Sequence, residues 1–184
     1  MSKKINVFYV WGYGSSPESH TVKDLQDLLG DDYNVVSDYY AQYNPEEAIN
    51  DIKYHIQEKK IDILVGSSLG GYIAMQIPHI KKVIINPCIC PLYELPLLTD
   101  EAGEPCVPPH IVDFYFNWDN KHNVWETFNN SETVFIMGED DEVFGTKYIE
   151  EVKEHSTKVN VVKQGHQNTR ESVEQFVVPV IKKI

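Results

Sequence analysis

A strand-like segment that runs straight into a helix is the feature that most constrains this chain. Residues 61–65 form a mostly apolar run of strand length, and an apolar helical stretch that ends near Pro78 follows after only six residues. Those six are Gly66-Ser67-Ser68-Leu69-Gly70-Gly71, which contain the pattern G-x-S-x-G centred on Ser68. Glycines two positions before and after the serine let strand and helix pass closely, while the sharp turn lifts the hydroxyl above the sheet. Ser68 is therefore the candidate nucleophile, and the alternative is a glycine-rich turn with an incidental serine.

The rest of the chain alternates between strand-like and helix-like segments. Short apolar runs predict strands, and apolar residues spaced by three and four predict helices. Runs that are apolar throughout suit a sheet covered on both faces, and helices between strands imply parallel crossovers. We therefore predict an α/β fold, a doubly wound and mostly parallel six-stranded sheet in one domain of residues 1–184. The expected strands are residues 5–10, 33–37, 61–65, 82–86, 132–137 and 159–163, and the expected helices are residues 19–29, a helix opened by Pro45, the helix after Ser68, and residues 146–155 and 169–183.

Residues 87–130 break this rhythm. They hold six of the ten prolines and two of the three tryptophans, and they contain no clear strand. Connections longer than about 15 residues inside a compact domain are usually lids or binding loops. We expect this segment to be a cap inserted after the fourth strand.

Charge and cysteine content narrow the classes of partner. The formal net charge is −12, from 28 acidic against 16 basic residues, and such a surface repels nucleic-acid phosphates and anionic lipid heads. We therefore expect neither a nucleic-acid nor a membrane partner.

The three cysteines do not form a disulfide framework, and without a signal-peptide pattern they indicate a cytoplasmic protein. The spacing of Cys88, Cys90, Cys106 and His110 matches no common zinc module, so we expect no metal and regard the cysteines as buried cap thiols.

A serine hydroxyl is a weak nucleophile and needs a neighbouring base, which an acid must orient. In a strand–serine–helix arrangement of this kind the chain order is serine, acid, histidine. Four acids in succession follow the fifth predicted strand, and the offset from Gly138 favours Asp141 over Asp140, with Asp140 as the alternative. His166 directly follows the last predicted strand, whereas the other histidines lie in or beside predicted helices or within residues 87–130. His166 is therefore the candidate base.

Attack on a carbonyl also requires N–H donors for the oxyanion. One is expected from Leu69, which follows the nucleophile at the start of a helix. The other is expected from the loop after the first strand, residues 11–17, where we favour the N–H of Tyr13. Trp11, Tyr13 and Trp118 are the expected substrate-binding side chains, with aromatic packing between cap and core as the alternative.

Five places in chain order resemble the small YqiA/YcfP-type serine esterases of the α/β-hydrolase superfamily. They are residues 11–17, 65–72, 85–87, 138–143 and 165–166, and with the closing helix the resemblance spans nearly the whole chain apart from the cap. It implies a single-domain hydrolase of short acyl esters whose triad lies at Ser68, Asp141 and His166. Two departures are visible: Trp11 replaces the histidine that usually begins the first loop, and residues 167–169 differ from the usual pattern of a small and then an aromatic residue.

Together these observations predict a carboxylic ester hydrolase, with thioesters as possible substrates, that acts on a small-molecule acyl substrate through an acyl-enzyme and needs no cofactor. An acyltransferase would use the same residues, and a non-catalytic hydrolase-like binding protein is the alternative from another class. The acyl group and the oligomeric state are not encoded in these patterns.

Overall fold

The computed structural model describes residues 3–100, 102–128 and 132–184. Within these residues lies one six-stranded sheet in which every neighbouring pair is parallel, in the order β2-β1-β3-β4-β5-β6. The order reverses between β1 and β3, and parallel sheets open a crevice for ligands at the carboxyl ends of such strands. The predicted fold class is confirmed. The strands are β1 (Ile5–Val10), β2 (Tyr33–Val36), β3 (Ile63–Ser67), β4 (Lys81–Ile85), β5 (Thr133–Gly138) and β6 (Val159–Val162).

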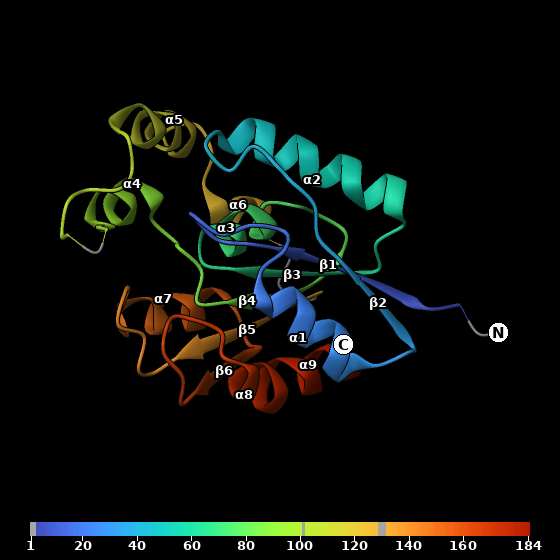
Figure 1. Cartoon of the computed structure of the whole chain (residues 1–184). Coiled ribbons are helices and arrows are strands. Elements are labelled where there is room, and N and C mark those ends of the chain that lie inside the picture. The colour runs from blue at the N-terminus through green and yellow to red at the C-terminus, as the bar shows by residue number, and fades with distance from the viewer. Residues whose placement is uncertain (1–2, 101, 129–131) are drawn as a thin grey trace.

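Helices cover both faces of the sheet (Figure 1). On one face α1 (His20–Leu29) packs against the C-terminal helical segments, which are α8 (Arg170–Ser172), η3 (Val173–Val177) and α9 (Val178–Lys183). On the other face α2 (Pro45–Lys59) packs against α3 (Leu69–Met75). Every residue of β3 is buried, because this central strand is covered on both sides. Next to β6 lies α7 (Lys147–His155).

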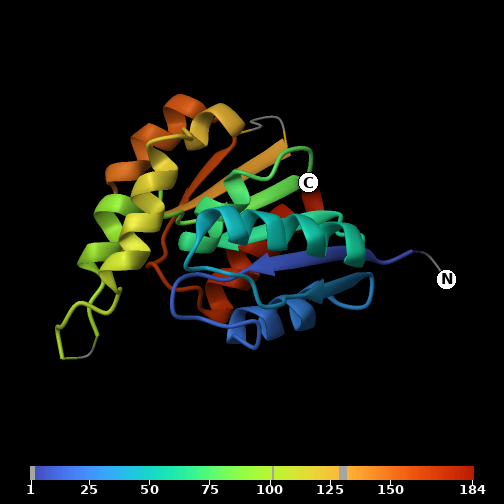
Figure 2. The ribbon, with the colours of Figure 1, turned by 90° about the horizontal axis from the view of Figure 1, so that it is seen from above.

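The described part of the connection between β4 and β5 includes four helical elements. They are α4 (Pro91–Glu94), η1 (Leu95–Leu97), α5 (Pro109–Asp119) and α6 (Val124–Thr127). Figure 2 shows α4 and α5 beyond the carboxyl ends of the strands, at the end of the molecule opposite the N-terminus. Side chains of α5 bind the core directly, since the Tyr115 hydroxyl donates to the Gln42 carbonyl at 2.7 Å and the Trp118 indole donates to the Gln76 amide oxygen at 2.6 Å.

Most strand bounds lie within one residue of the sequence expectation, and two larger differences occur. The third strand begins at Ile63 rather than at residue 61, and it continues through Ser67, so that the nucleophile candidate follows it at once. The C-terminal helix is also not uniform. It passes through the π-helical turn η3 directly before Pro179, since a proline has no N–H for the regular ladder and its ring collides with the preceding turn.

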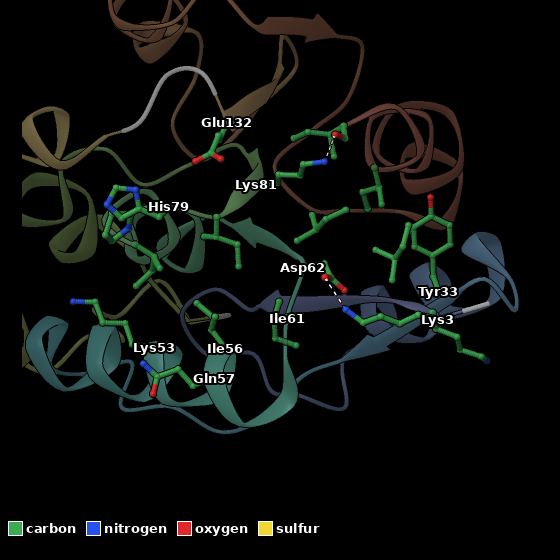
Figure 3. A pocket seen from close by; sticks show the side chains of 18 of the residues that line it. Lys3, Tyr33, Lys53, Ile56, Gln57, Ile61, Asp62, His79, Lys81 and Glu132 are labelled. Atoms are coloured by element: carbon green, nitrogen blue, oxygen red, sulfur yellow. Dashed lines mark hydrogen bonds and ion pairs between the residues drawn. The ribbon is translucent and has the colours of Figure 1, made fainter. Parts of the chain in front are cut away.

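A cavity of about 770 Å³ lies at the amino ends of the strands (Figure 3). Its wall includes Lys3, Asp62 and Lys81, and Lys3 and Asp62 form an ion pair at 3.6 Å across its edge. This is the edge of the sheet opposite to the one at which Ser68 lies. Across the described residues, no helix is both long and apolar enough to cross a bilayer.

Candidate active site

Ser68 lies between β3 and α3 in a backbone conformation that L-residues rarely adopt. Its φ and ψ are 55° and −124°. Its N–H donates to the Ile85 carbonyl at 3.0 Å, and its carbonyl accepts from the N–H groups of Tyr72 and Cys88, both at 3.1 Å. These three bonds hold the turn, and strained backbone that is held by its surroundings is a common feature of functional sites. The arrangement has the geometry expected of a nucleophile elbow.

Glycines allow the close approach that this turn needs. A Cβ at Gly70 would lie 2.2 Å from the Val10 carbonyl oxygen, so any other residue there would drive α3 away from β1. A Cβ at Gly12 would lie 3.0 Å from Ser68 Cβ and 3.6 Å from Ser68 Oγ. The loop after β1 therefore borders the hydroxyl of Ser68 directly.

The structure brings Ser68, His166 and Asp141 into one hydrogen-bonded chain. His166 Nε2 lies 3.0 Å from Ser68 Oγ, and His166 Nδ1 lies 2.9 Å from Asp141 Oδ2. Because a carboxylate only accepts, Nδ1 carries the proton and Nε2 is left to accept from the serine hydroxyl. The aromatic ring of Phe144 meets the imidazole edge to face, with ring centroids 4.6 Å apart.

Asp141, and not Asp140, is the acid that contacts the histidine. The side chain of Asp141 is only 4% exposed, and its Oδ1 accepts from the N–H groups of Val143 at 2.9 Å and Phe144 at 2.8 Å. Burial alone would raise the pKa of Asp141, but the bonds from His166 and from these two amides hold its pKa below the usual value. Asp140 is exposed, and it contributes its backbone N–H to the Gln164 carbonyl at 3.2 Å.

The loop that carries His166 is anchored by side chains to which the sequence analysis gave no role. Asn86 binds the carbonyl of Gly165, and Glu142 binds the N–H of His166. On the other side of the loop the Asn168 amide donates to Ser67 Oγ at 3.2 Å. These residues come from four separate parts of the chain, so no local sequence pattern could have revealed that they meet.

The two expected oxyanion donors occupy different settings. Leu69 is the first residue of α3, where a helix leaves its N–H without an intrahelical acceptor. Tyr13 follows Gly12 in the loop that borders Ser68, and its hydroxyl donates to the Cys106 carbonyl at 3.2 Å. The Tyr13 ring also lines a cavity of about 560 Å³ together with Tyr43 and Phe114.

Two of the side chains expected to bind substrate make hydrogen bonds and ring contacts with other residues of the protein. Trp11 is 3% exposed, its indole N–H donates to the Asp38 carbonyl at 3.1 Å, and its ring packs on Tyr40. Trp118 donates to Gln76 and stacks on His122 with ring centroids 3.7 Å apart. Both indoles therefore pack within the scaffold, as in the packing alternative, and their role in substrate binding stays a prediction.

The cysteines are not uniformly buried thiols. Cys88 is buried, Cys90 is partly buried and Cys106 is exposed. Burial raises the pKa of the Cys88 thiol well above its ordinary value, which keeps it protonated and unreactive. No cluster of three metal-ligating side chains occurs in the part of the chain that the structure describes.

Residues 6–182 match the Uncharacterised protein family (UPF0227). The chain belongs to this family. The resemblance to YqiA/YcfP-type proteins that the sequence suggested is thereby confirmed. No curated protein matches the chain.

Solved structures similar to this UPF0227 member are α/β-hydrolases. A putative hydrolase from Agrobacterium vitis S4 aligns with a TM-score of 0.76 and 17% identity over 98% of this chain and 87% of that chain. Est1E from Butyrivibrio proteoclasticus aligns with a TM-score of 0.72 and 14% identity over 98% and 88% of the two chains. MGS-MChE2, an α/β-hydrolase enzyme from a lagoon-sediment metagenome, aligns with a TM-score of 0.72 and 19% identity over 98% and 90%. At these identities the likeness shows the α/β-hydrolase fold.

Proposed function

We propose that this UPF0227 protein is a serine hydrolase that cleaves small carboxylic esters through an acyl-enzyme. The observation that carries the proposal is the hydrogen-bonded chain from Ser68 through His166 to Asp141, with Ser68 at a strained strand-to-helix turn. Nucleophile and base within hydrogen-bond reach, with a third group orienting the base, is the arrangement that activates a serine.

In the first half of the reaction Ser68 Oγ forms a bond to the carbonyl carbon of the ester, and its proton passes to His166 Nε2. The imidazolium that forms is stabilised by the carboxylate of Asp141, 2.9 Å from Nδ1. The N–H groups of Leu69 and Tyr13 are the proposed donors to the oxyanion, and each such donor is worth about 10²- to 10³-fold in kcat. His166 then gives its proton to the alkoxide that leaves as the carbon–oxygen bond breaks.

In the second half a water molecule attacks the acyl carbon, and His166 Nε2 takes one of its protons. That proton returns to Ser68 Oγ as the acyl bond breaks, which releases a carboxylic acid and restores the enzyme. The depressed pKa of Asp141 keeps its carboxylate ionised throughout, so the same tautomer of His166 is available for both steps.

The substrate class is proposed from the mechanism and from similar proteins. Ferulic acid binds the esterase Est1E, as another structure of that protein records, and this suggests that aromatic acyl groups belong in the first set of esters tested. The cavity beside Tyr13 has aromatic walls of the kind that receives such groups.

A fluorophosphonate probe combined with a panel of p-nitrophenyl esters tests the proposal. The wild-type protein should be labelled and should hydrolyse short acyl esters, whereas Ser68→Ala should lose both the label and turnover. Ser67→Ala is the matched control, because it removes the adjacent hydroxyl without touching an atom of the triad. It should retain the label, although Asn168 loses one acceptor. Labelling that persists in Ser68→Ala would refute the nucleophile assignment.

The alternatives give different results in the same assays. A non-catalytic binding protein would show neither label nor turnover with any ester. An acyltransferase would be labelled, but added alcohols or thiols would divert the acyl group into new esters or thioesters rather than into the free acid.

A further inference from the structure

Asn86 lies at the point where the two partners of the nucleophile come together. It directly follows β4, between the elbow after β3 and the acid loop after β5, and it is 1% exposed. Its φ is 41°, a left-handed conformation that asparagine tolerates better than most L-residues. A buried, polar, non-glycine residue in this conformation needs strong local bonding.

The side chain of Asn86 joins the loops of both partners. Its Oδ1 accepts from the N–H of Gly138 at 2.7 Å, and its Nδ2 donates to the carbonyls of Gly165 at 3.0 Å and His166 at 3.5 Å. Its backbone N–H also donates to the carbonyl of Ile136 at 3.0 Å. The amide orientation is fixed, because an N–H only donates and a carbonyl only accepts. Asn86 thus ties the end of β5, where the acid loop begins, to the loop of the histidine.

Glu142 holds the same loop from the opposite direction. Its Oε2 accepts from the N–H of His166 at 2.9 Å, and a Cβ at Gly165 would lie only 2.7 Å from that oxygen. Asn86 therefore binds carbonyl groups of residues 165 and 166, while Glu142 binds the amide between them. The loop needs this support, since it follows β6, which is an edge strand that pairs only with β5.

We propose that Asn86 is the positioning residue that sets His166 against both Ser68 and Asp141, with Glu142 as a second anchor. The catalytic part of this inference rests on the proposed function. Asn86 touches none of the reacting atoms and acts through the backbone of the histidine loop. A displacement of about 1 Å costs about 10²-fold in rate, so the imidazole must be held this tightly.

Substituting Asn86 by aspartate removes the Nδ2 group that donates to the histidine loop. Asn86→Asp keeps an acceptor for the Gly138 amide but places a second oxygen against the Gly165 carbonyl. We expect kcat to fall about 10²-fold with little change in KM. Because a protonated carboxyl can donate again, the ratio of the variant kcat to the wild-type kcat should rise as the pH falls. Asn86→Gly removes both the Oδ1 acceptor and the Nδ2 donor at a φ that glycine adopts without strain. It should lower kcat at least as much as Asn86→Asp does, at every pH.

The matched control is Gln76→Glu. Gln76 is also buried, and its amide accepts from the Trp118 indole and donates to the Tyr72 carbonyl, so the substitution likewise keeps the acceptor and removes the donor. It should lower the melting temperature about as much as Asn86→Asp does and leave kcat unchanged.

At the exposed Glu142, Glu142→Ala should lower kcat about tenfold. Glu142→Gln should keep the wild-type kcat, because its amide oxygen still accepts from the N–H of His166. Equal loss of kcat in Gln76→Glu and Asn86→Asp, or full activity in Asn86→Gly, would overturn the proposal.

The downfield NMR resonance of the His166 Nδ1 proton separates the positioning role from the proposed function. This resonance reports the bond to Asp141 and requires no turnover. It should be present in the wild type and in Gln76→Glu, and weakened or lost in Asn86→Asp. If the wild type hydrolyses no ester but Asn86→Asp still loses the resonance, the hydrolase proposal fails and the positioning role stands. If the resonance is unchanged in both Asn86 variants, the positioning role fails.

Discussion

Lys82 lies in the centre of the sheet and is the residue whose replacement should stabilise the protein most clearly. The residue is 0% exposed in β4, and its Nζ has no hydrogen-bond partner among the described residues. Burial lowers the pKa of Lys82 from 10.5 to about 8, and the nearby charge of Glu132 offsets this only in part. Since one pH unit of pKa corresponds to about 1.4 kcal/mol, the charged lysine costs the folded state about 3 kcal/mol.

We therefore expect Lys82→Met to be more stable than the wild type by about 3 kcal/mol at pH 7. Below pH 8 the ammonium is charged in both folded and unfolded chains, so the full penalty is present. As the pH rises from about 8 to 10.5, the folded protein loses this proton before the unfolded chain does. The wild type gains stability over this window, and the advantage of the variant should shrink.

Urea unfolding at pH 7, 8, 9 and 10 measures this difference directly. Buried tyrosines also titrate at high pH, but they are common to both proteins and cancel in the comparison. Lys81→Met is the control, because Lys81 is the adjacent residue of the same strand and is exposed. It should change stability by no more than about 0.5 kcal/mol at every pH. A Lys82→Met variant that is less stable than the wild type, or an advantage that grows above pH 8, would refute the reasoning.

Three further predictions concern the site and its surroundings. Asp141→Asn should lower kcat by about 10⁴-fold because the amide favours the wrong tautomer of the histidine, whereas Asp140→Asn should stay within a few-fold of wild type; the reverse order in steady-state kinetics would reassign the acid. Gly12→Val should lower kcat at least tenfold with the far-UV circular dichroism spectrum unchanged, because its Cβ would lie 3.0 Å from Ser68 Cβ; full activity would show that the loop yields. Glu94→Ala should destabilise the protein by about 2 kcal/mol in urea, because the 2% exposed carboxylate accepts two bonds of 2.6 Å from α7; an unchanged midpoint would contradict it.

The sequence was a good guide to the sheet because the buried strands are mostly apolar. The two-residue offset of β3 arose because Ile61 is apolar like the strand but lies before it, separated from it by Asp62, whose carboxylate accepts from the backbone N–H of Asn6. The C-terminal segment looked like one helix because its apolar spacing is helical throughout. The π-helical turn before Pro179 depends on backbone geometry, which periodicity does not report.

The candidate triad was predictable because chain order restricts each member to one loop. Ser68, Asp141 and His166 each follow a strand, and parallel strands bring such loops to one edge. The anchors of the histidine were not predictable, because the side-chain partners of Asn86 lie 52 to 80 residues away. The packing contacts of Trp11 and Trp118 were not predictable from the sequence, because an aromatic side chain near a site is equally suited to packing and to binding.

Ser68 and His166 lie far apart along the chain, and this bears on the stage of folding at which the hydroxyl of Ser68 gains its base. Their bond joins residues 98 positions apart, and the histidine loop follows β6, which pairs with β5 at the edge of the sheet. A folding intermediate that contains only β1 to β4 would already hold the turn at Ser68. It would lack the imidazole of His166, so the serine hydroxyl would have no base. If Ser68 is the nucleophile of an esterase, as proposed, a partly folded chain should therefore not react with acyl esters until its last strand has joined the sheet.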